Sequence, residues 1–164
     1  MQTLLPLAEQ VAARLKARGE TIGVSESSSG GLVSAALLAQ AGASAYYRGG
    51  GVIYAAPAFR GLMQLNKSDI EGTRSSTEPY AQIMARTIRT RLRADWGLSE
   101  TGAAGPSGNP YGDAAGHTCI GICGRIDGNP VELSFTLETG LSDRAENMRL
   151  FAKEALERVL AVLA

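Results

Sequence analysis

The sequence has 164 residues, of which 45% are hydrophobic and 20% charged. This composition is typical of a globular protein, and the length suffices for one domain with a sizeable core. The 16 basic and 16 acidic residues balance, so the charge favours neither a nucleic acid nor a membrane surface as partner. No apolar stretch approaches the roughly 20 residues that cross a bilayer, and no signal peptide is evident. We predict a single cytoplasmic domain over residues 1–164, without membrane or nucleic-acid contact.

The first part of the chain alternates between helix and strand patterns. Apolar residues at helical spacing predict a helix that ends near Gly19, and residues 21–24 are predicted to form a short strand. A loop of small polar residues follows at 25–31, before a helix at 32–39. In this order of strand, turn and helix, helical N–H groups can collect an anion. An equally good alternative is that the serine hydroxyls only cap the helix and its turn.

The middle of the chain predicts a second strand over residues 52–55, ended by Pro57, and a short helix over residues 59–65. Capping hydroxyls before a proline at 75–79 mark the start of a longer helix that runs to about Ala94. We expect the arginines of this helix to form a solvated face, because no aromatic residues alternate with them as in a nucleic-acid patch.

The second half predicts a strand at Trp96–Glu100, followed by a glycine- and proline-rich loop at Thr101–Asp113. Strands at 116–123 and 131–137 form a hairpin, and an amphipathic helix from about Ser142 closes the chain. Helices flanking a mixed, mostly parallel sheet predict an α/β fold of three layers, α/β/α. Loops at the carboxyl ends of the strands are expected to form the site.

The serine-rich loop at 25–31 and the glycine-rich loop at 101–113 are expected to face each other across one pocket. Glycine permits backbone conformations and close approaches that a Cβ forbids, and free backbone N–H groups can then line a cradle for a negatively charged ligand.

The cysteines and the histidine give no indication of a metal site. Cys119 and Cys123 are the only cysteines, and their spacing in a strand favours buried, reduced thiols over a disulfide. With His117 as the only histidine, a structural zinc site is improbable, and a structural role for this histidine is favoured over a catalytic one.

Six motifs, spread in order over nearly the whole chain, resemble those of the C-terminal domain of the CinA proteins, the nicotinamide-mononucleotide deamidase family. Residues 25–31 (SESSSGG) resemble its AESCTGG signature, residues 41–47 (AGASAYY) its AGSSAWF segment, residues 51–54 (GVIY) its FVTY strand, residues 77–78 (TE) its SE pair, residues 101–106 (TGAAGP) its TGIAGP motif, and Asp143, Arg144 and Arg149 its DR…R pattern.

The resemblance implies a metal- and cofactor-independent amidohydrolase that converts the nicotinamide nucleotide to its acid nucleotide and ammonia. It implies a phosphorylated nucleotide as ligand and a homodimer as assembly. Ser44 would be the nucleophile, assisted by Tyr54 and by a lysine five residues further on. The implied ligand-binding residues belong to the two loops and the last helix: Glu26, Ser27, Ser28, Ser29, Gly30, Gly31, Thr101, Gly102, Gly105 and Arg149.

The chain departs from the family pattern at the expected lysine, which is Phe59 here. Arg60 is no substitute, because a guanidinium stays protonated, and Lys67, eight residues after Phe59, is predicted to be an exposed side chain. Glu100 and Glu26 are the candidate replacement bases, although for each carboxylate the acceptance of backbone N–H groups in its own loop is favoured over catalysis.

Three hypotheses follow from the sequence. The first is an amidohydrolase with Ser44, Tyr54 and Glu100 as catalytic residues. The second is a domain that binds a nucleotide or another anion without catalysis. The third is a protein-interaction module, which the polar, glycine-lined loops favour least.

Overall fold

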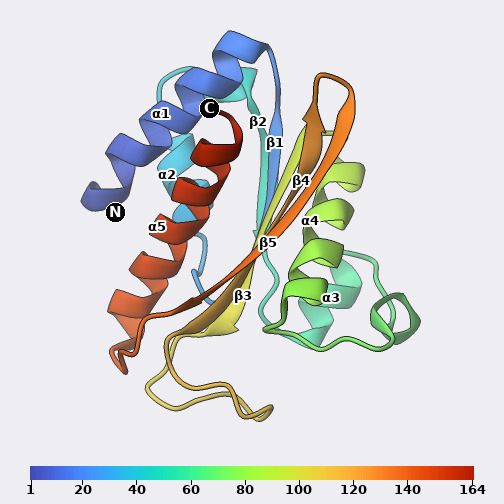
Figure 1. The fold of residues 1–164 in the computed structure, drawn as a ribbon, viewed down its shortest axis with the longest axis vertical. Helices are drawn as coiled ribbons and strands as arrows, with labels where there is room; N and C mark the ends of the chain where they lie inside the picture. Colours follow the sequence, from blue (N-terminus) through green and yellow to red (C-terminus); the bar gives the residue numbers. More distant parts are fainter.

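The computed structural model describes all 164 residues as a five-stranded sheet between two layers of helices (Figure 1). The strands are β1 (Ile22–Glu26), β2 (Tyr47–Val52), β3 (Trp96–Ala103), β4 (His117–Ile126) and β5 (Asn129–Glu138). The helices are α1 (Leu5–Arg18), α2 (Leu32–Leu38), α3 (Ala56–Gly61), α4 (Glu78–Leu92) and α5 (Arg144–Val162), and the 3-10 turns are η1 (Gln2–Leu4), η2 (Ala43–Ala45) and η3 (Lys67–Ile70). The predicted three-layer α/β/α fold is confirmed.

The sheet has the order β2-β1-β3-β4-β5. β1 pairs with β2 and with β3 in parallel, and the β3–β4 and β4–β5 pairs are antiparallel. β4 alone therefore runs against the other strands, as expected for a mixed, mostly parallel sheet with a late hairpin. The carboxyl ends of β1, β2 and β3 meet at one edge, where the loops that follow them lie together.

The core lies mainly between the sheet and one helical layer. α1, α2 and α5 cover this face (Figure 1), and their apolar side chains join those of the central strands, including Trp96, Leu98 and Ile122, in one buried cluster. α4 and α3 cover the other face over a smaller cluster that includes Met63, Met84 and Ile88. Cys119 and Cys123 are buried free thiols. None of the helices combines the length and apolar character that a membrane span requires.

α4 packs closely on the sheet because two strand glycines leave room for the helix backbone. A Cβ added at Gly97 would lie 2.1 Å from the carbonyl oxygen of Ala85, and one at Gly121 would lie 2.5 Å from that of Ala81. Between these contacts, the Ser99 hydroxyl donates to the Ala81 carbonyl at 2.6 Å.

We therefore expect Gly97→Ala to lower the free energy of unfolding by about 3 kcal/mol, because α4 must move away from the sheet. Gly61→Ala is the matched control, since a Cβ there meets no atom within 4 Å, and its effect is expected to stay within about 0.5 kcal/mol. Urea denaturation measures both. Equal effects of the two substitutions would contradict this close packing.

Several element limits differ from those predicted. β2 occupies residues 47–52 rather than 52–55, because its glycines belong to the strand: a Cβ at Gly50 would lie 2.7 Å from the Val24 carbonyl oxygen of β1. Pro57 lies in the first turn of α3 rather than ending a strand, where its missing N–H costs nothing. β3 continues to Ala103, so residues 101–103 belong to the strand and the glycine-rich loop begins at residue 104.

Candidate functional site

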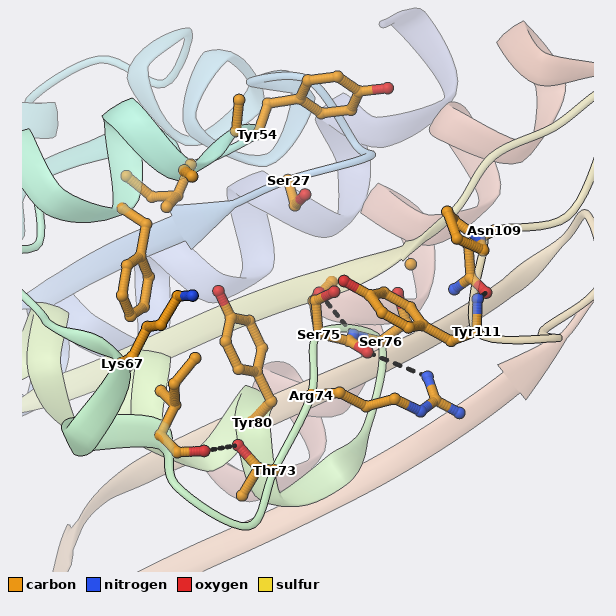
Figure 2. Close-up of a pocket in the computed structure, with 18 of the residues that line it drawn as sticks. Ser27, Tyr54, Lys67, Thr73, Arg74, Ser75, Ser76, Tyr80, Asn109 and Tyr111 are labelled. Carbon is orange, nitrogen blue, oxygen red and sulfur yellow. Dashed lines mark hydrogen bonds between the residues drawn. The ribbon is translucent and has the colours of Figure 1, made fainter.

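A pocket of about 890 Å³ opens at the edge where β1, β2 and β3 end (Figure 2). Ser27 follows β1, residues 53–56 follow β2, and Thr101 and Gly102 belong to β3. The remaining wall comes from Phe59 and Arg60 of α3, Asn66 and Lys67 at η3, residues 70–76, Tyr80 of α4, and residues 109–111 of the glycine-rich loop. The serine-rich and glycine-rich loops thus line one pocket, as expected from the sequence.

The pocket contains only part of the predicted site. Ser27, Tyr54, Thr101 and Gly102 line it. The other predicted residues do not line it: Glu26, Ser28, Ser29, Gly30, Gly31, Ser44, Glu100, Gly105 and Arg149. Glu26 and Glu100 are buried and bind backbone N–H groups, Ser44 lies before β2, and Arg149 pairs with Glu146 on α5.

Glu100 is buried, with 3% of its surface exposed, and its carboxylate is directed at the serine-rich loop. It accepts the backbone N–H groups of Ser27 at 3.0 Å and Ser29 at 2.8 Å. The hydroxyls of Ser28 and Thr118 donate to its other oxygen at 2.5 and 2.9 Å. These donors occupy the carboxylate, so its geometry is that of a group that holds the loop.

Glu26 plays the same part for the start of α2. Its carboxylate accepts the N–H groups of Val33 at 3.0 Å and Ser34 at 2.8 Å, and the Ser34 hydroxyl donates to it at 2.6 Å. The Ser29 hydroxyl lies 2.8 Å from a carboxylate oxygen of each glutamate. Two of the loop amides predicted to cradle an external anion, those of Ser27 and Ser29, thus bind the protein's own Glu100 carboxylate.

Ser27 differs from its two neighbours because its hydroxyl has no hydrogen-bond partner within the protein. The hydroxyls of Ser28 and Ser29 are engaged by the buried glutamates. Ser27 is half-buried at the pocket wall, and only its backbone N–H is held by Glu100, at 3.0 Å. The loop thus presents one unengaged hydroxyl to the pocket.

Ser44 lies outside the pocket. It belongs to η2, immediately before β2, whereas Tyr54 follows that strand. The six residues of β2, at roughly 3.3 Å each, separate the two side chains by roughly 20 Å. The expectation that Ser44 attacks a ligand held beside Tyr54 is therefore not met within this chain.

Arg144 reaches the site instead of Arg149. Arg149 pairs with Glu146 on its own helix, and its Nη1 lies 3.2 Å from the Thr3 hydroxyl. Arg144 donates to the Gly105 carbonyl at 2.7 Å and to the Tyr54 hydroxyl at 3.1 Å. It therefore connects the last helix, the glycine-rich loop and the residue that follows β2.

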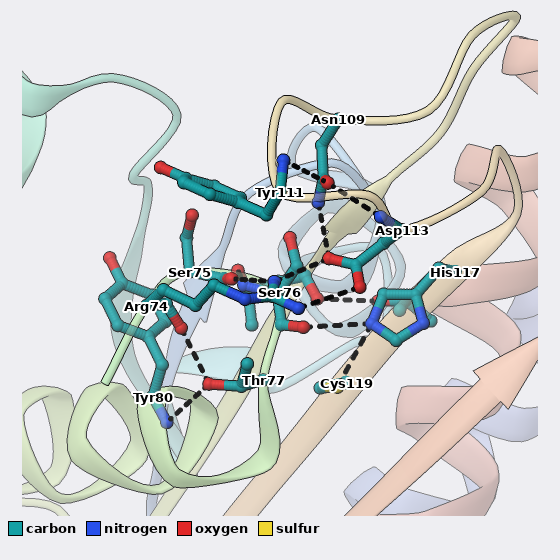
Figure 3. Close-up of polar contacts among 12 residues, drawn as sticks. Arg74, Ser75, Ser76, Thr77, Tyr80, Asn109, Tyr111, Asp113, His117 and Cys119 are labelled. Carbon is teal, nitrogen blue, oxygen red and sulfur yellow. Dashed lines mark hydrogen bonds and ion pairs between the residues drawn. The ribbon is translucent and has the colours of Figure 1, made fainter. Parts of the chain in front are cut away.

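An ion pair fixes the side of the pocket formed by the glycine-rich loop (Figure 3). Arg74 donates to the two carboxylate oxygens of Asp113 at 2.6 and 2.9 Å, and Asn109 donates to the same carboxylate at 2.7 Å. The Arg74 guanidinium also lies 5.2 Å from the Tyr111 ring centre. The hydrogen bonds that Asp113 accepts, first from Arg74 and then from Asn109, lower the pKa of its carboxyl group to about 2. Sequence reasoning missed this pair.

We expect Asp113→Asn to show the pH dependence of this ion pair. The pKa of Asp113 lies at about 2 against an ordinary 3.8, so its carboxylate adds stability above the higher value, and this contribution is lost as the pH falls toward the lower one. The substitution should therefore lower the free energy of unfolding at neutral pH and have little effect near pH 2. Urea denaturation at both pH values measures this. An equal loss at both would show that charge is not the cause.

His117, the first residue of β4, contacts the segment that carries the pocket residue Ser76 (Figure 3). Its Nε2 lies 2.9 Å from the Ser76 carbonyl, and its Nδ1 lies 2.5 Å from a Glu138 oxygen. Burial lowers the pKa of His117, but these two acceptors outweigh burial and raise it. The contact with Nε2 holds the backbone of Ser76, whose φ is 60°. The Ser76 N–H in turn donates to the Thr101 hydroxyl at 3.1 Å. The structural role favoured from the sequence fits this geometry.

Lys67 is exposed, as predicted, and it also lines the pocket. Phe59 stacks on Tyr80, with ring centres 6.3 Å apart and an angle of 22° between the rings. Figure 2 shows the ends of the Lys67 and Tyr80 side chains turned into the same space, with Ser27 and Tyr54 across the pocket from them. No group of three or more His, Cys, Asp or Glu side chains is placed to hold a metal ion.

Comparison with known proteins agrees with the motifs. Residues 4–163 match the CinA C-terminal domain family. A CinA-like protein of Nostoc sp. (strain PCC 7120 / SAG 25.82 / UTEX 2576) is 38% identical over 121 residues, which are 74% of this chain and 28% of that protein. A CinA-like protein of Chlorobium limicola is 32% identical over 157 residues, 96% of this chain and 37% of that protein. The chain spans about a third of the length of these curated relatives.

Solved structures share the fold over nearly the full length. The competence/damage inducible protein CihA from Agrobacterium tumefaciens superposes with a TM-score of 0.88 at 26% identity, covering 98% of this chain and 96% of that one. The competence damage-inducible protein A (ComA) from Klebsiella pneumoniae gives a TM-score of 0.87 at 27% identity and the same coverage of 98% and 96%. This chain belongs to the CinA family, as a CinA C-terminal domain.

Proposed function

We propose that this chain hydrolyses the carboxamide of a phosphorylated nucleotide of the nicotinamide mononucleotide type, without a metal, and that Ser27 is its nucleophile. One observation carries the proposal: Ser27 presents a hydroxyl without a protein partner to a pocket that Tyr54 and Thr101 also line. The three residues follow or end three neighbouring parallel strands. They also stand in three of the motifs that resemble the deamidase family.

The chemistry is that of acyl transfer to a serine. The Ser27 oxygen attacks the amide carbonyl, the carbon–nitrogen bond breaks, and ammonia leaves with a proton from the site. Water then cleaves the acyl-serine ester and releases the carboxylic acid nucleotide. Glu100 fixes the attacking residue through its backbone N–H at 3.0 Å, which keeps the hydroxyl in place for attack.

Tyr54 is the pocket's candidate proton donor. Its hydroxyl oxygen accepts from Arg144 at 3.1 Å, which leaves the phenol hydrogen available to a ligand. This hydrogen can be donated to the carbonyl oxygen that becomes negative during attack. The exposed position of Tyr54, with 63% of its surface accessible, places this donor at the mouth of the pocket.

The pocket also fits the ring and size of such a ligand. Its volume of about 890 Å³ lies in the range of roughly 300–1,000 Å³ that holds drug-sized ligands. The stacked Phe59 and Tyr80 side chains supply a flat apolar wall for an aromatic base. Phe59 thus contributes to binding at the position where the family pattern has a lysine.

A second candidate function is nucleotide binding without hydrolysis. The observation that favours it is that no side chain able to accept a proton is hydrogen-bonded to the Ser27 hydroxyl. Removal of the base from a serine nucleophile lowers the rate by several orders of magnitude. A protein without such a base would still bind the nucleotide but would not hydrolyse it at a measurable rate.

Purified protein incubated with nicotinamide mononucleotide distinguishes the two functions. Under the proposed function, ammonia and the acid nucleotide form in equal amounts. A rise in melting temperature with the nucleotide but no ammonia would support the second function. Neither ammonia nor a thermal shift would contradict both.

A further inference from the structure

The ligand phosphate has no place at the start of α2, although that is where the sequence pattern directs it. The N–H groups of Val33 and Ser34 bind Glu26, and those of Ser27 and Ser29 in the preceding turn bind Glu100. Both carboxylates are buried, with 1% and 3% of their surfaces exposed. A phosphate brought to these amides would meet two negative charges at close range, so the anionic end of a ligand must be bound elsewhere.

Three cationic side chains belong to the lining of the pocket. Arg60, Lys67 and Arg74 line the pocket, but Arg74 is already engaged with both oxygens of Asp113. Neither Arg60 nor Lys67 has a hydrogen-bond or ion-pair partner anywhere in the protein. Each of the other two lysines is engaged: Lys16 donates to a carbonyl at 3.3 Å and Lys153 to a glutamate at 2.7 Å.

Both unpartnered cations come from the short segment that runs from α3 to η3. Arg60 lies in the last turn of α3, and Lys67 is the first residue of η3. The start of η3 is fixed, because the Asn66 N–H donates to the Asp69 carboxylate at 2.6 Å. Among the carboxylates of the protein, only Glu71 lines the pocket. Glu71 makes no ion pair with Arg60 or Lys67, so the pocket lining holds more positive than negative charge.

We propose that Arg60 and Lys67 form the phosphate-binding end of the pocket and select nucleotides over nucleosides; this inference rests on the proposed function. A phosphate offers several strong acceptor oxygens, and the guanidinium and ammonium groups supply charge-assisted donors. The aromatic ring then lies against Phe59 and Tyr80, and the carboxamide reaches Ser27 across the pocket. The two ends of the ligand are thus recognised by different segments.

The test compares nicotinamide mononucleotide with nicotinamide riboside, which lacks the phosphate. Calorimetric titration of the Ser27→Ala variant measures both dissociation constants without turnover. We expect the nucleotide to bind at least about tenfold more tightly than the riboside. Lys67→Met and Arg60→Met should each reduce this ratio severalfold, and the double variant should bring it near one, with riboside affinity unchanged. Both side chains are exposed, so folding should not be affected.

The control is Lys153→Met, which removes a lysine that pairs with Glu157 on α5 and lies outside the pocket. It should leave the ratio as it is. If the nucleotide and the riboside both bind and the ratio survives in the double variant, the phosphate assignment is wrong while the proposed function stands. If neither compound binds, the proposed function fails, and the phosphate assignment fails with it.

Discussion

Ser27→Ala is expected to reduce ammonia release from nicotinamide mononucleotide by about 10³-fold or more, because the nucleophile of the reaction is removed. The substitution leaves the Ser27 backbone N–H on Glu100 in place and breaks no side-chain hydrogen bond. The variant should therefore fold with unchanged stability and retain its affinity for the nucleotide. Ammonia production and a thermal melt with and without nucleotide measure the two effects separately.

Ser44→Ala is the matched control for this prediction. Ser44 is an exposed serine before β2, at the opposite end of that strand from the pocket. Loss of its hydroxyl should therefore change the rate of ammonia release by no more than about twofold. Loss of activity in Ser44→Ala with activity retained in Ser27→Ala would show that the site is assembled differently from the pocket described above.

Glu100→Gln has the largest expected effect on stability, a loss of about 3 kcal/mol or more in the free energy of unfolding. The carboxylate accepts from two backbone N–H groups and from the Ser28 and Thr118 hydroxyls, and the Ser29 hydroxyl also lies 2.8 Å from it. The glutamine amide nitrogen replaces one of the accepting oxygens by a donor, which then faces other donors in a buried site. Because the turn that carries Ser27 loses its support, ammonia release should fall as well.

The control for Glu100→Gln is Glu9→Gln, at an exposed position of α1 without a hydrogen-bond partner, where the change should stay within about 0.5 kcal/mol. Urea denaturation of both variants compares them directly. If Glu100→Gln unfolded at the same urea concentration as Glu9→Gln, the buried carboxylate would not be the support of the loop.

Much of the fold could be predicted because local signals set it. Gly19 ends α1 with a φ of 64°, the Thr77 hydroxyl caps α4, and the Asp143 carboxylate caps α5, all at or near the residues that the sequence indicates. β2 was misplaced because its run of glycines has the composition of a turn. Only the neighbouring strand shows why glycine is needed there: a Cβ at Gly50 would meet β1.

The site could be predicted only where a motif and a strand end coincide. Ser27, Tyr54 and Thr101 meet for that reason. Ser44 is expected with them only from its position in the motif at 41–47, and the limits of β2, Tyr47–Val52, put a whole strand between Ser44 and Tyr54. The motif does not indicate at which end of β2 this serine lies.

Side-chain pairings across the fold leave no local trace in the sequence. Arg74 and Asp113 are 39 residues apart, and neither lies in a pattern that indicates the other. The sequence indicates that Glu26 and Glu100 can accept backbone N–H groups or act as a base. The burial of both carboxylates favours the first role, and burial depends on tertiary packing that the local sequence does not show. The place of Lys67 in the pocket likewise depends on tertiary packing, since Ile70 of η3 packs against the apolar cluster that includes Tyr80 and Met84.

Hydroxylamine trapping tests the central claim most directly, because it reports whether Ser27 forms a covalent ester with the nucleotide's acyl group. With nicotinamide mononucleotide and hydroxylamine, the protein should produce the nucleotide hydroxamate together with ammonia, and Ser27→Ala should produce neither. Ammonia released without any hydroxamate, or hydroxamate formed equally well by Ser27→Ala, would contradict attack by this serine.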